Sequence, residues 1–331
     1  MSAIVSILVP IYGVERYIEK CVRSLMEQSY EHIEYIFVDD CTPDKSIEIL
    51  QRVLNEYPHR KDHVSIYKNK KNSGLSASRK HALEKATGDY FTTVDSDDFL
   101  EKEGMERMVE CMQQTNADVV VSDFIMDYDN NVCRSVQGID SEEPSSYMKA
   151  MMTGEIYGST CNKLYRRSLI DNVDVPLYID GANFTEDLGF NLKVFPHAKK
   201  VSYLPIAYYH YCIYDNSMSH ATIDPDRARK KDLQKVVNIQ DVSRYLDVIG
   251  YTPRVEKELN YCKLIAKMPF LAVVNKRSCL RWCAIFPEAN KAIWENDRLP
   301  LTYKLELQLL RLKWINLFVW IQNLKIKLAK R

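Results

Sequence analysis

Between residues 90 and 100 the chain reads Tyr90-Phe-Thr-Thr-Val-Asp-Ser-Asp-Asp-Phe-Leu100. The apolar, β-branched run from Phe91 to Val94 predicts a buried strand. Three carboxylates follow within four positions, and carboxylates this close together repel one another and lose hydration when they are buried. A divalent cation is their simplest partner, because Mg²⁺ and Mn²⁺ prefer oxygen ligands and often bridge to phosphates. On this stretch alone, a solvated acidic turn is an equally good interpretation.

The composition is that of a globular protein with one large domain or two. The 331 residues are 46% hydrophobic and 27% charged, and 45 Lys and Arg residues balance 45 Asp and Glu residues. This balance argues against a general nucleic-acid binder. The nine cysteines show no Cys-x-x-Cys pair and no zinc-site spacing, so we expect reduced thiols.

The N-terminal segment predicts a first strand and not a signal peptide. Ala3 to Ile11 is apolar, but it lacks a basic lead-in and a cleavage site, and Pro10 falls within it. No window reaches the roughly 18 uninterrupted apolar residues that a spanning helix needs. We therefore expect a cytoplasmic protein.

Strand and helix patterns alternate through the first hundred residues. Apolar runs predict strands at 5–12, 33–38, 64–67 and 91–94, and the segments between them predict helices at 17–26, 46–54 and 75–86. Such alternation is typical of an α/β fold with a mostly parallel sheet flanked by helices. Ligands of these sheets bind beyond the carboxyl ends of the strands. We therefore expect a shared site for Tyr12, Asp39, Asp40 and the acidic turn 95–98.

Beyond residue 101 the pattern is mixed. It predicts a helix at 103–114, a strand at 118–122 and a hairpin or loop at 127–138. Polar residues between short apolar runs are framed by the segments 159–167 and 183–189. Glu186 and Asp187 begin a helix through Val194, where carboxylates interact well with the helix dipole, although this is also an ordinary preference of helix starts.

Together these motifs resemble the inverting family 2 nucleotide-sugar glycosyltransferases with the GT-A fold. The match runs from Val5 to about His220, and the order and spacing of its parts make it specific. These parts are Val5-Ser-Ile-Leu-Val-Pro-Ile-Tyr12, Val38-Asp-Asp40, Asn72-Ser-Gly-Leu-Ser-Ala-Ser-Arg79, Gly88-Asp-Tyr-Phe-Thr-Thr-Val-Asp-Ser-Asp-Asp98, Asn162-Lys-Leu-Tyr-Arg-Arg167, Thr185-Glu-Asp187 and Asn216-Ser-Met-Ser219. We expect a Rossmann-like catalytic domain at 1–222, with a nucleotide-binding half at about 1–100 and an acceptor half at about 101–222, and a helical C-terminal region at 223–331.

The resemblance implies nucleotide-binding roles for the N-terminal motifs. Pro10 and Tyr12 would line the base pocket, with Tyr12 near the face of the pyrimidine. Asp40, helped by Asp39, would accept a hydrogen bond from the uracil ring. Arg79 would lie near the diphosphate or help to order its loop.

The resemblance also implies the chemical roles. Asp95, Ser96 and Asp97 form the D-x-D motif, one of whose carboxylates would contact ribose, and Asp97 or Asp98 would bind Mg²⁺ or Mn²⁺. Asp187 matches the catalytic base, and its neighbour Glu186 could substitute for it. Such a base takes the acceptor proton and typically contributes about 10²–10⁴-fold, while the cation stabilises charge on the departing diphosphate.

Some positions depart from the family pattern. Gly13 stands where the family commonly has Asn, and Cys41 where it commonly has Gly. Cys212 and Tyr214 stand where the family usually has an Arg and a His near the diphosphate. His210 and His220 are candidates to compensate, and a structural role is the alternative for His210.

The C-terminal third predicts helices at 227–246 and 254–268 and a final amphipathic basic helix at about 301–331. That helix interleaves Trp and Leu with Lys and Arg, which suits the interface of an anionic membrane. We expect it to hold the protein at the inner face of the plasma membrane. The alternative is a helix packed on the catalytic domain, or on a second copy of the chain in a homo-oligomer.

These observations favour an inverting hexosyltransferase that moves a sugar from a UDP-sugar to a glycan or lipid-linked acceptor in surface polysaccharide synthesis. One alternative is a non-catalytic nucleotide-sugar-binding scaffold, which the altered Cys212 and Tyr214 favour. The other is a sugar nucleotidylyltransferase, which would need a Gly-rich basic loop where the chain has Pro10-Ile-Tyr-Gly13. A dehydrogenase or P-loop enzyme is disfavoured, because neither glycine motif is present.

Overall fold

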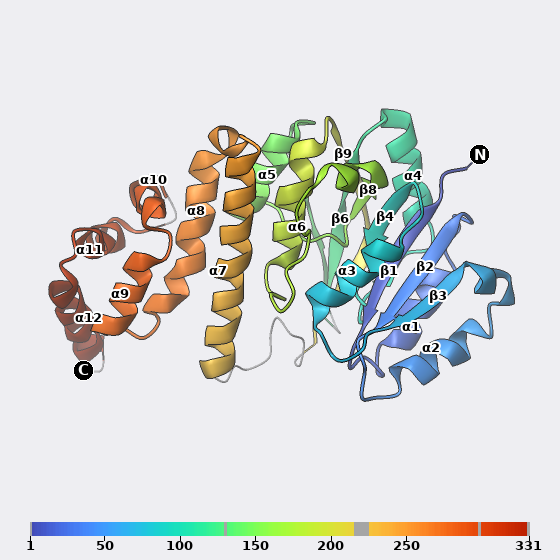
Figure 1. Ribbon diagram of the computed structural model, residues 1–331, viewed down its shortest axis with the longest axis horizontal. Coiled ribbons are helices and arrows are strands. Elements are labelled where there is room, and N and C mark those ends of the chain that lie inside the picture. The colour runs from blue at the N-terminus through green and yellow to red at the C-terminus, as the bar shows by residue number, and fades with distance from the viewer. Residues whose placement is uncertain (1, 129–130, 215–224, 297–298, 330–331) are drawn as a thin grey trace. The chain divides into compact units, whose positions relative to one another are not determined.

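The computed structural model describes residues 2–128, 131–214, 225–296 and 299–329. The chain divides into two compact units, Met1–Thr222 and Ile223–Arg331. Figure 1 shows a sheet flanked by helices in the first unit and helices alone in the described part of the second.

The first unit is built on a sheet with the strand order β3-β2-β1-β4-β8-β6-β9-β5, and β7 pairs with β6. Strands β3, β2, β1 and β4 run parallel, as predicted. Beyond β4 the sheet becomes mixed, because β8 runs antiparallel to both of its neighbours. The strands are β1 Val5–Ile11, β2 Ile33–Asp39, β3 Val64–Lys68, β4 Tyr90–Thr93, β5 Phe99–Leu100, β6 Val119–Tyr128, β7 Asn131–Ser135, β8 Lys163–Arg166 and β9 Val201–Cys212.

The helices of this unit connect and cover the strands. They are α1 Ile18–Met26, α2 Ser46–Leu54, α3 Leu75–Lys85, α4 Gly104–Thr115, α5 Pro144–Thr153 and α6 Glu186–Val194, with the 3-10 turns Pro58–His63, Arg167–Asn172 and Phe195–His197. The predicted α/β class is confirmed, and the sequence also predicted the bounds of α2 and α6.

Strand β1 lies at the centre of the core. Every residue from Val5 to Ile11 is buried, and alternate side chains pack with α1 and α2 in one apolar cluster. Burying one such side chain stabilises the folded state by about 1.5–3 kcal/mol. The core therefore holds β1 firmly, and with it the position of the residues at its carboxyl end. Pro10 fits this central strand because its nitrogen faces the β4 side, where pairing has already ended at Leu8 and Thr93.

The second unit consists of helices in the part that the structure describes. They are α7 Pro225–Val248, α8 Glu256–Lys267, α9 Lys276–Ala284, α10 Ala292–Glu295, α11 Leu301–Arg311 and α12 Ile315–Ala329, with 3-10 turns at Thr252–Arg254, Met268–Leu271 and Pro287–Lys291. Among the described residues, no helix has both the length and the apolar character needed to cross a membrane.

The prediction of a single helix over 301–331 is wrong. Helix α11 ends where Lys313 adopts a positive φ of 61°. The N–H of Lys313 bonds to the carbonyl of Leu310, and the N–H of Trp314 bonds back to the carbonyl of Leu309. This is the Schellman pattern of a helix C-terminus, and the chain restarts as α12. Glu306 of α11 then accepts bonds from Gln322 and Lys325 of α12.

Candidate active site

The loop before α3 is organised by Asp40, at the carboxyl end of β2. The buried Asp40 carboxylate accepts bonds from the Asn69 side chain at 2.7 Å and from the backbone N–H groups of Ser73 and Gly74, each at 2.8 Å. Asp39 accepts from the Thr42 N–H at 2.8 Å. Both predicted base-binding acids therefore have protein partners, and their contact with uracil stays a prediction.

The same loop meets the segment that precedes α6. Ser76 donates its N–H to the Asn183 side chain at 3.0 Å and its hydroxyl to the Ala182 carbonyl at 2.8 Å. Gly74 has φ of +88°, and a Cβ there would stand 2.4 Å from the Asn183 amide nitrogen. Only glycine fits this conformation and this close approach.

Two other residues of the predicted base pocket lie at the carboxyl end of β1, Pro10 within the strand and Tyr12 just after it. Tyr12 is 49% exposed, which leaves its ring accessible, whereas Pro10 is buried in the strand. Cys41, where glycine is common in the resembling family, adopts a positive φ of 57°. The positive φ explains why glycine is common at this position in the family that the sequence resembles, because residues with a side chain rarely adopt this backbone conformation.

The three carboxylates of the acidic turn face different partners. Asp95 pairs with Arg79 at 2.7 Å, and Ser96 is buried. Asp98 is buried and accepts bonds from the Tyr209 hydroxyl at 2.5 Å and the Cys212 N–H at 2.7 Å. Asp98, predicted as a metal ligand, is thus bound through both oxygens to β9, because the turn points it into the protein.

Burial controls the ionisation of this turn. Burial, with the charges of Asp97 and Asp95 next, raises the pKa of Asp98 well above its ordinary value. Burial, followed by the charge of Asp95, raises the pKa of Asp97 to about 6. An added positive charge would oppose both effects.

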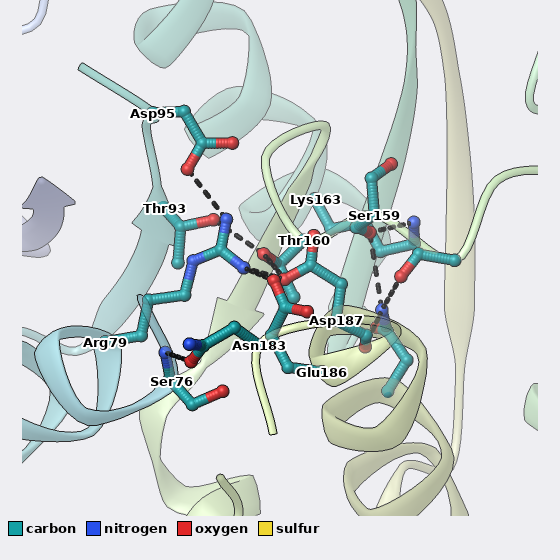
Figure 2. A network of polar contacts seen from close by, with 12 residues as sticks. Ser76, Arg79, Thr93, Asp95, Ser159, Thr160, Lys163, Asn183, Glu186 and Asp187 are labelled. Carbon is teal, nitrogen blue, oxygen red and sulfur yellow. Dashed lines mark hydrogen bonds and ion pairs between the residues drawn. The ribbon is translucent and has the colours of Figure 1, made fainter. Parts of the chain in front are cut away.

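Arg79 joins the acidic turn to the helix that carries the predicted base. Figure 2 shows its guanidinium between Asp95 on one side and Glu186 and Asp187 on the other. Nη1 donates to Glu186 Oε1 at 2.8 Å and to Asp187 Oδ1, and Nη2 donates to Asp95. The side chain is 1% exposed, so three carboxylates hold it; its predicted place beside the diphosphate stays a prediction.

The pKa values of the two acids at the start of α6 are raised. Burial, with the charge of Asp187 next, raises the pKa of Glu186 to about 8, although Arg79 opposes this. Burial also raises the pKa of Asp187, against the lowering effects of Arg79 and Thr160. A carboxylate with a raised pKa is a stronger base toward a hydroxyl proton.

Thr93 and Thr160 also reach this site, and they were not singled out from the sequence. Thr160 Oγ1 donates to Asp187 Oδ1 at 3.1 Å, and Thr93 Oγ1 lies 2.7 Å from Thr160 Oγ1. The sequence signal was weak: Thr93 ends the central strand, and Thr160 stands in the polar stretch before Asn162-Lys-Leu-Tyr-Arg-Arg167.

The departures from the family pattern have partners of their own. Tyr214 stacks on Tyr17 with ring centroids 4.0 Å apart, and its hydroxyl is 3.5 Å from the Asp97 carbonyl. His210 lies 2.8 Å from Glu101 and 3.3 Å from Asp127, and it stacks on Phe99. These contacts fit the structural alternative for His210. His220 and the motif 216–219 lie outside the described residues.

The acidic turn offers ligands of the right chemistry for a divalent cation. Three carboxylates contact the Arg79 guanidinium in Figure 2, namely Asp95, Glu186 and Asp187, and two more, Asp97 and Asp98, belong to the same acidic turn as Asp95. Across the residues with described positions, no group of three or more His, Cys, Asp or Glu side chains has metal-binding geometry. Carboxylate oxygens and an excess of negative charge suit a divalent cation, and oxygens of a bound sugar donor would help to ligate it.

Comparison with known proteins identifies the family. The profile described as "Glycosyl transferase family 2" matches residues 6–174. The chain belongs to this family. The predicted family is thereby confirmed, and the relatives of the chain are named as glycosyltransferases.

Three relatives illustrate the similarity. The chain is 31% identical to EpsH of Bacillus subtilis (strain 168) over 65% of this chain and 62% of EpsH, so it spans less than two thirds of that protein. It is 29% identical to EpsJ of the same strain, named an uncharacterized glycosyltransferase, over 94% of this chain and 87% of EpsJ. A crystal structure of S. aureus TarS 1-349 in complex with UDP-GlcNAc has a TM-score of 0.70 at 22% identity, covering 98% of this chain and 92% of that one. This likeness supports the GT-A fold.

Proposed function

We propose that the protein transfers a hexosyl group from a UDP-sugar to an acceptor hydroxyl by a single, inverting displacement, with Asp187 as the general base. The observation that carries this proposal is the ion-pair network through Arg79, which joins Asp95 of the D-x-D motif to Asp187. The TarS chain that resembles this one was solved with UDP-GlcNAc and with UDP, which supports a UDP-sugar donor.

Asp187 is the better base of the two acids. Its side chain is 22% exposed, against 9% for Glu186, so it can meet an acceptor. With a pKa of about 8, Glu186 keeps its own proton at neutral pH. A protonated acid cannot accept the acceptor proton, and Glu186 therefore supports Asp187 and does not replace it.

We propose that the acidic turn 95–98 also holds a metal ion. Asp97 would hold Mg²⁺ or Mn²⁺, with Asp95 beside it, since Asp98 is bound to β9. When bound, the cation would supply positive charge that stabilises the departing UDP. The protein itself holds the acidic turn and the base in one rigid network of ion pairs through Arg79.

UDP release from a panel of UDP-sugars, with and without Mn²⁺, tests this proposal. Wild type should release UDP from one donor, and Asp187→Asn should lower the rate by about 10²–10⁴-fold. Asp180→Asn is the matched control, because Asp180 is 71% exposed and its ion pair with Lys80 is long, at 4.0 Å. Equal rates for wild type and Asp187→Asn would overturn the assignment of the base.

We further propose that the enzyme acts on a lipid-linked or surface-polysaccharide precursor at the inner face of the plasma membrane. An apolar face of α12 supports this location. Four of its exposed side chains recur every three or four residues and so share one side of the helix: Leu317, Trp320, Leu324 and Leu328. The same segment of the chain carries exposed basic residues, namely Arg311 and Lys313 before α12 and Lys327 within it. Anionic lipids complement such a face.

Co-sedimentation of the full-length protein with vesicles tests the location. Wild type should bind vesicles of phosphatidylcholine with phosphatidylglycerol better than phosphatidylcholine alone, and the double variant Trp320→Ser, Leu324→Ser should lose most of that binding. Val248→Ser, at an 85% exposed apolar position of α7, is the control. If the double variant instead binds vesicles like wild type but loses self-association in size-exclusion chromatography, the face is a contact between copies of the chain.

A further inference from the structure

We propose that Thr93 and Thr160 form a hydroxyl chain that holds Oδ1 of Asp187, so that Oδ2 is the oxygen that takes the acceptor proton. Thr160 and Thr93 are positioning residues in this proposal, which rests on the proposed role of Asp187 as the base. The geometry is 3.1 Å from Thr160 Oγ1 to Asp187 Oδ1 and 2.7 Å between the two threonine hydroxyls.

Counting protons fixes the direction of this chain. A carboxylate oxygen only accepts hydrogen bonds, so the single proton of the Thr160 hydroxyl lies toward Asp187. The Thr160 oxygen must then accept the proton of the Thr93 hydroxyl. The order of donation is therefore Thr93 to Thr160 to Asp187, and this order holds only while Asp187 is ionised.

The same count assigns the reactive oxygen. Asp187 Oδ1 accepts both from Arg79 Nη1 and from Thr160, and a carboxylate oxygen has about two lone-pair sites. Oδ1 is thereby fully used. The backbone N–H of Thr160 also bonds to this carboxyl, and because Oδ2 has two lone-pair sites it keeps at least one for the acceptor hydroxyl. The Asp187 side chain is 22% exposed, so the carboxyl as a whole is accessible to an acceptor.

The two threonines are rigidly held. Thr160 is 0% exposed and Thr93 is 1% exposed, and Thr93 is the last residue of the central strand β4. The buried Lys163 donates to the Ser159 carbonyl at 2.6 Å, and Asn191 of α6 donates to the Gly158 carbonyl at 2.9 Å. The Thr160 loop is therefore fastened both to β8 and to the base helix itself, as the contacts in Figure 2 indicate for Lys163 and Ser159.

These contacts also explain why the Lys163 amine is buried. It is a fully buried amine whose pKa is lowered to about 8, first by burial, and its donors are spent on the loop 157–162. It shapes the loop that presents the Thr160 hydroxyl, which accounts for a charged side chain inside the protein.

A double-mutant cycle on UDP release tests the chain. A hydrogen bond to a charged group is strong enough that Thr160→Val should lower kcat roughly 10- to 100-fold, and Thr160→Ser should restore most of it. Thr93→Val should lower kcat less and should add under about twofold in the Thr160→Val background, because its effect passes through Thr160. The affinity for UDP, measured by calorimetry, should stay unchanged in all of these variants. Thr115→Val, whose hydroxyl bonds within α4, is the control.

A second measurement separates this inference from the proposed function. Carbon-13 NMR of labelled aspartate, with the Asp187 signal assigned by its absence in Asp187→Asn, follows the ionisation of that carboxyl without turnover. Thr160→Val should raise the pKa of Asp187 and Thr160→Ser should return it. If wild type releases no UDP from any donor but the pKa of Asp187 shifts in Thr160→Val, the proposed function is wrong and the hydroxyl chain of Thr93 and Thr160 is supported. The hydroxyl chain would be refuted if the losses of kcat in Thr93→Val and Thr160→Val multiply in the double variant. It would also be refuted if the pKa of Asp187 does not change in Thr160→Val.

Discussion

Replacing Glu186 by glutamine should make the protein more stable than wild type at alkaline pH. The pKa of this buried acid is about 8 in the folded protein against an ordinary value of 4.5, so the folded state binds the proton more tightly than the unfolded chain does. The stability that this proton contributes is complete below pH 4.5 and is lost as the pH rises through 8. A glutamine does not titrate, and its carbonyl oxygen can still accept the bond from Arg79.

The size of the effect follows from the shift. Each pH unit between the two pKa values costs up to about 1.4 kcal/mol, so wild type should lose about 2 kcal/mol relative to Glu186→Gln between pH 6 and pH 8. Urea denaturation followed by circular dichroism at a series of pH values measures this difference through the midpoints, because all four tryptophans lie beyond residue 222 and would not report on the unit that contains Glu186. The magnitude applies to the unit Met1–Thr222, in which Glu186 lies.

A matched control separates this effect from the general pH dependence of the protein. Glu48 also stands in the first helical turn, of α2, but it is exposed. Glu48→Gln should therefore follow the wild-type curve at every pH. If the curves of Glu186→Gln and wild type stay parallel from pH 6 to pH 8, Glu186 is already ionised in the folded protein. Its proposed supporting role, as a protonated neighbour of the base, would then be wrong.

Three further variants test other parts of the site. Asp97→Asn should weaken the Mn²⁺-dependent part of UDP binding by about tenfold or more in calorimetry, and an unchanged metal dependence would remove Asp97 from the metal site. Asp98→Ala should cost about 1–3 kcal/mol for each buried donor that it leaves unpaired, namely the Tyr209 hydroxyl and the Cys212 N–H, and urea midpoints equal to wild type would contradict this. Gly74→Ala should cost about 1–3 kcal/mol because of its positive φ, with a further loss from the clash with Asn183; a neutral substitution would show that the loop relaxes easily.

The sequence predicted the parts of the fold that local patterns determine. Strand β1 and helices α2 and α6 are long apolar or periodic segments, so their place in the chain could be read directly. The antiparallel insertion of β8 beside β4 could not, because a strand of four residues carries no signal of its direction or its partners. The break at Lys313 was missed for a related reason: lysine is a normal helix residue, and only the backbone bonds of the C-terminus reveal its positive φ.

The candidate site divides in the same way. The motifs pointed to Arg79, Asp95 and Asp187, and the structure brings these three together. It turns Asp98 away toward β9, and it adds Thr93 and Thr160, whose hydroxyls matter only through distances across the fold. Single polar residues acquire such roles from tertiary contacts that a pattern along the chain does not encode.

The loop before α3 connects Asp40 to the segment before α6, which has a consequence for how the two halves of the site respond to ligands. Asp40 holds the backbone of Ser73 and Gly74, and two residues later Ser76 holds the segment that leads into Asp187. If a nucleotide binds at Asp40 as proposed, a movement of Asp40 would be transmitted through these hydrogen bonds to the segment that carries the base. By thermodynamic reciprocity, whatever nucleotide binding does to the setting of the base, an acceptor at the base does to nucleotide affinity by the same factor. Such a linkage would make the affinities for donor and acceptor depend on one another, whichever of the two binds first.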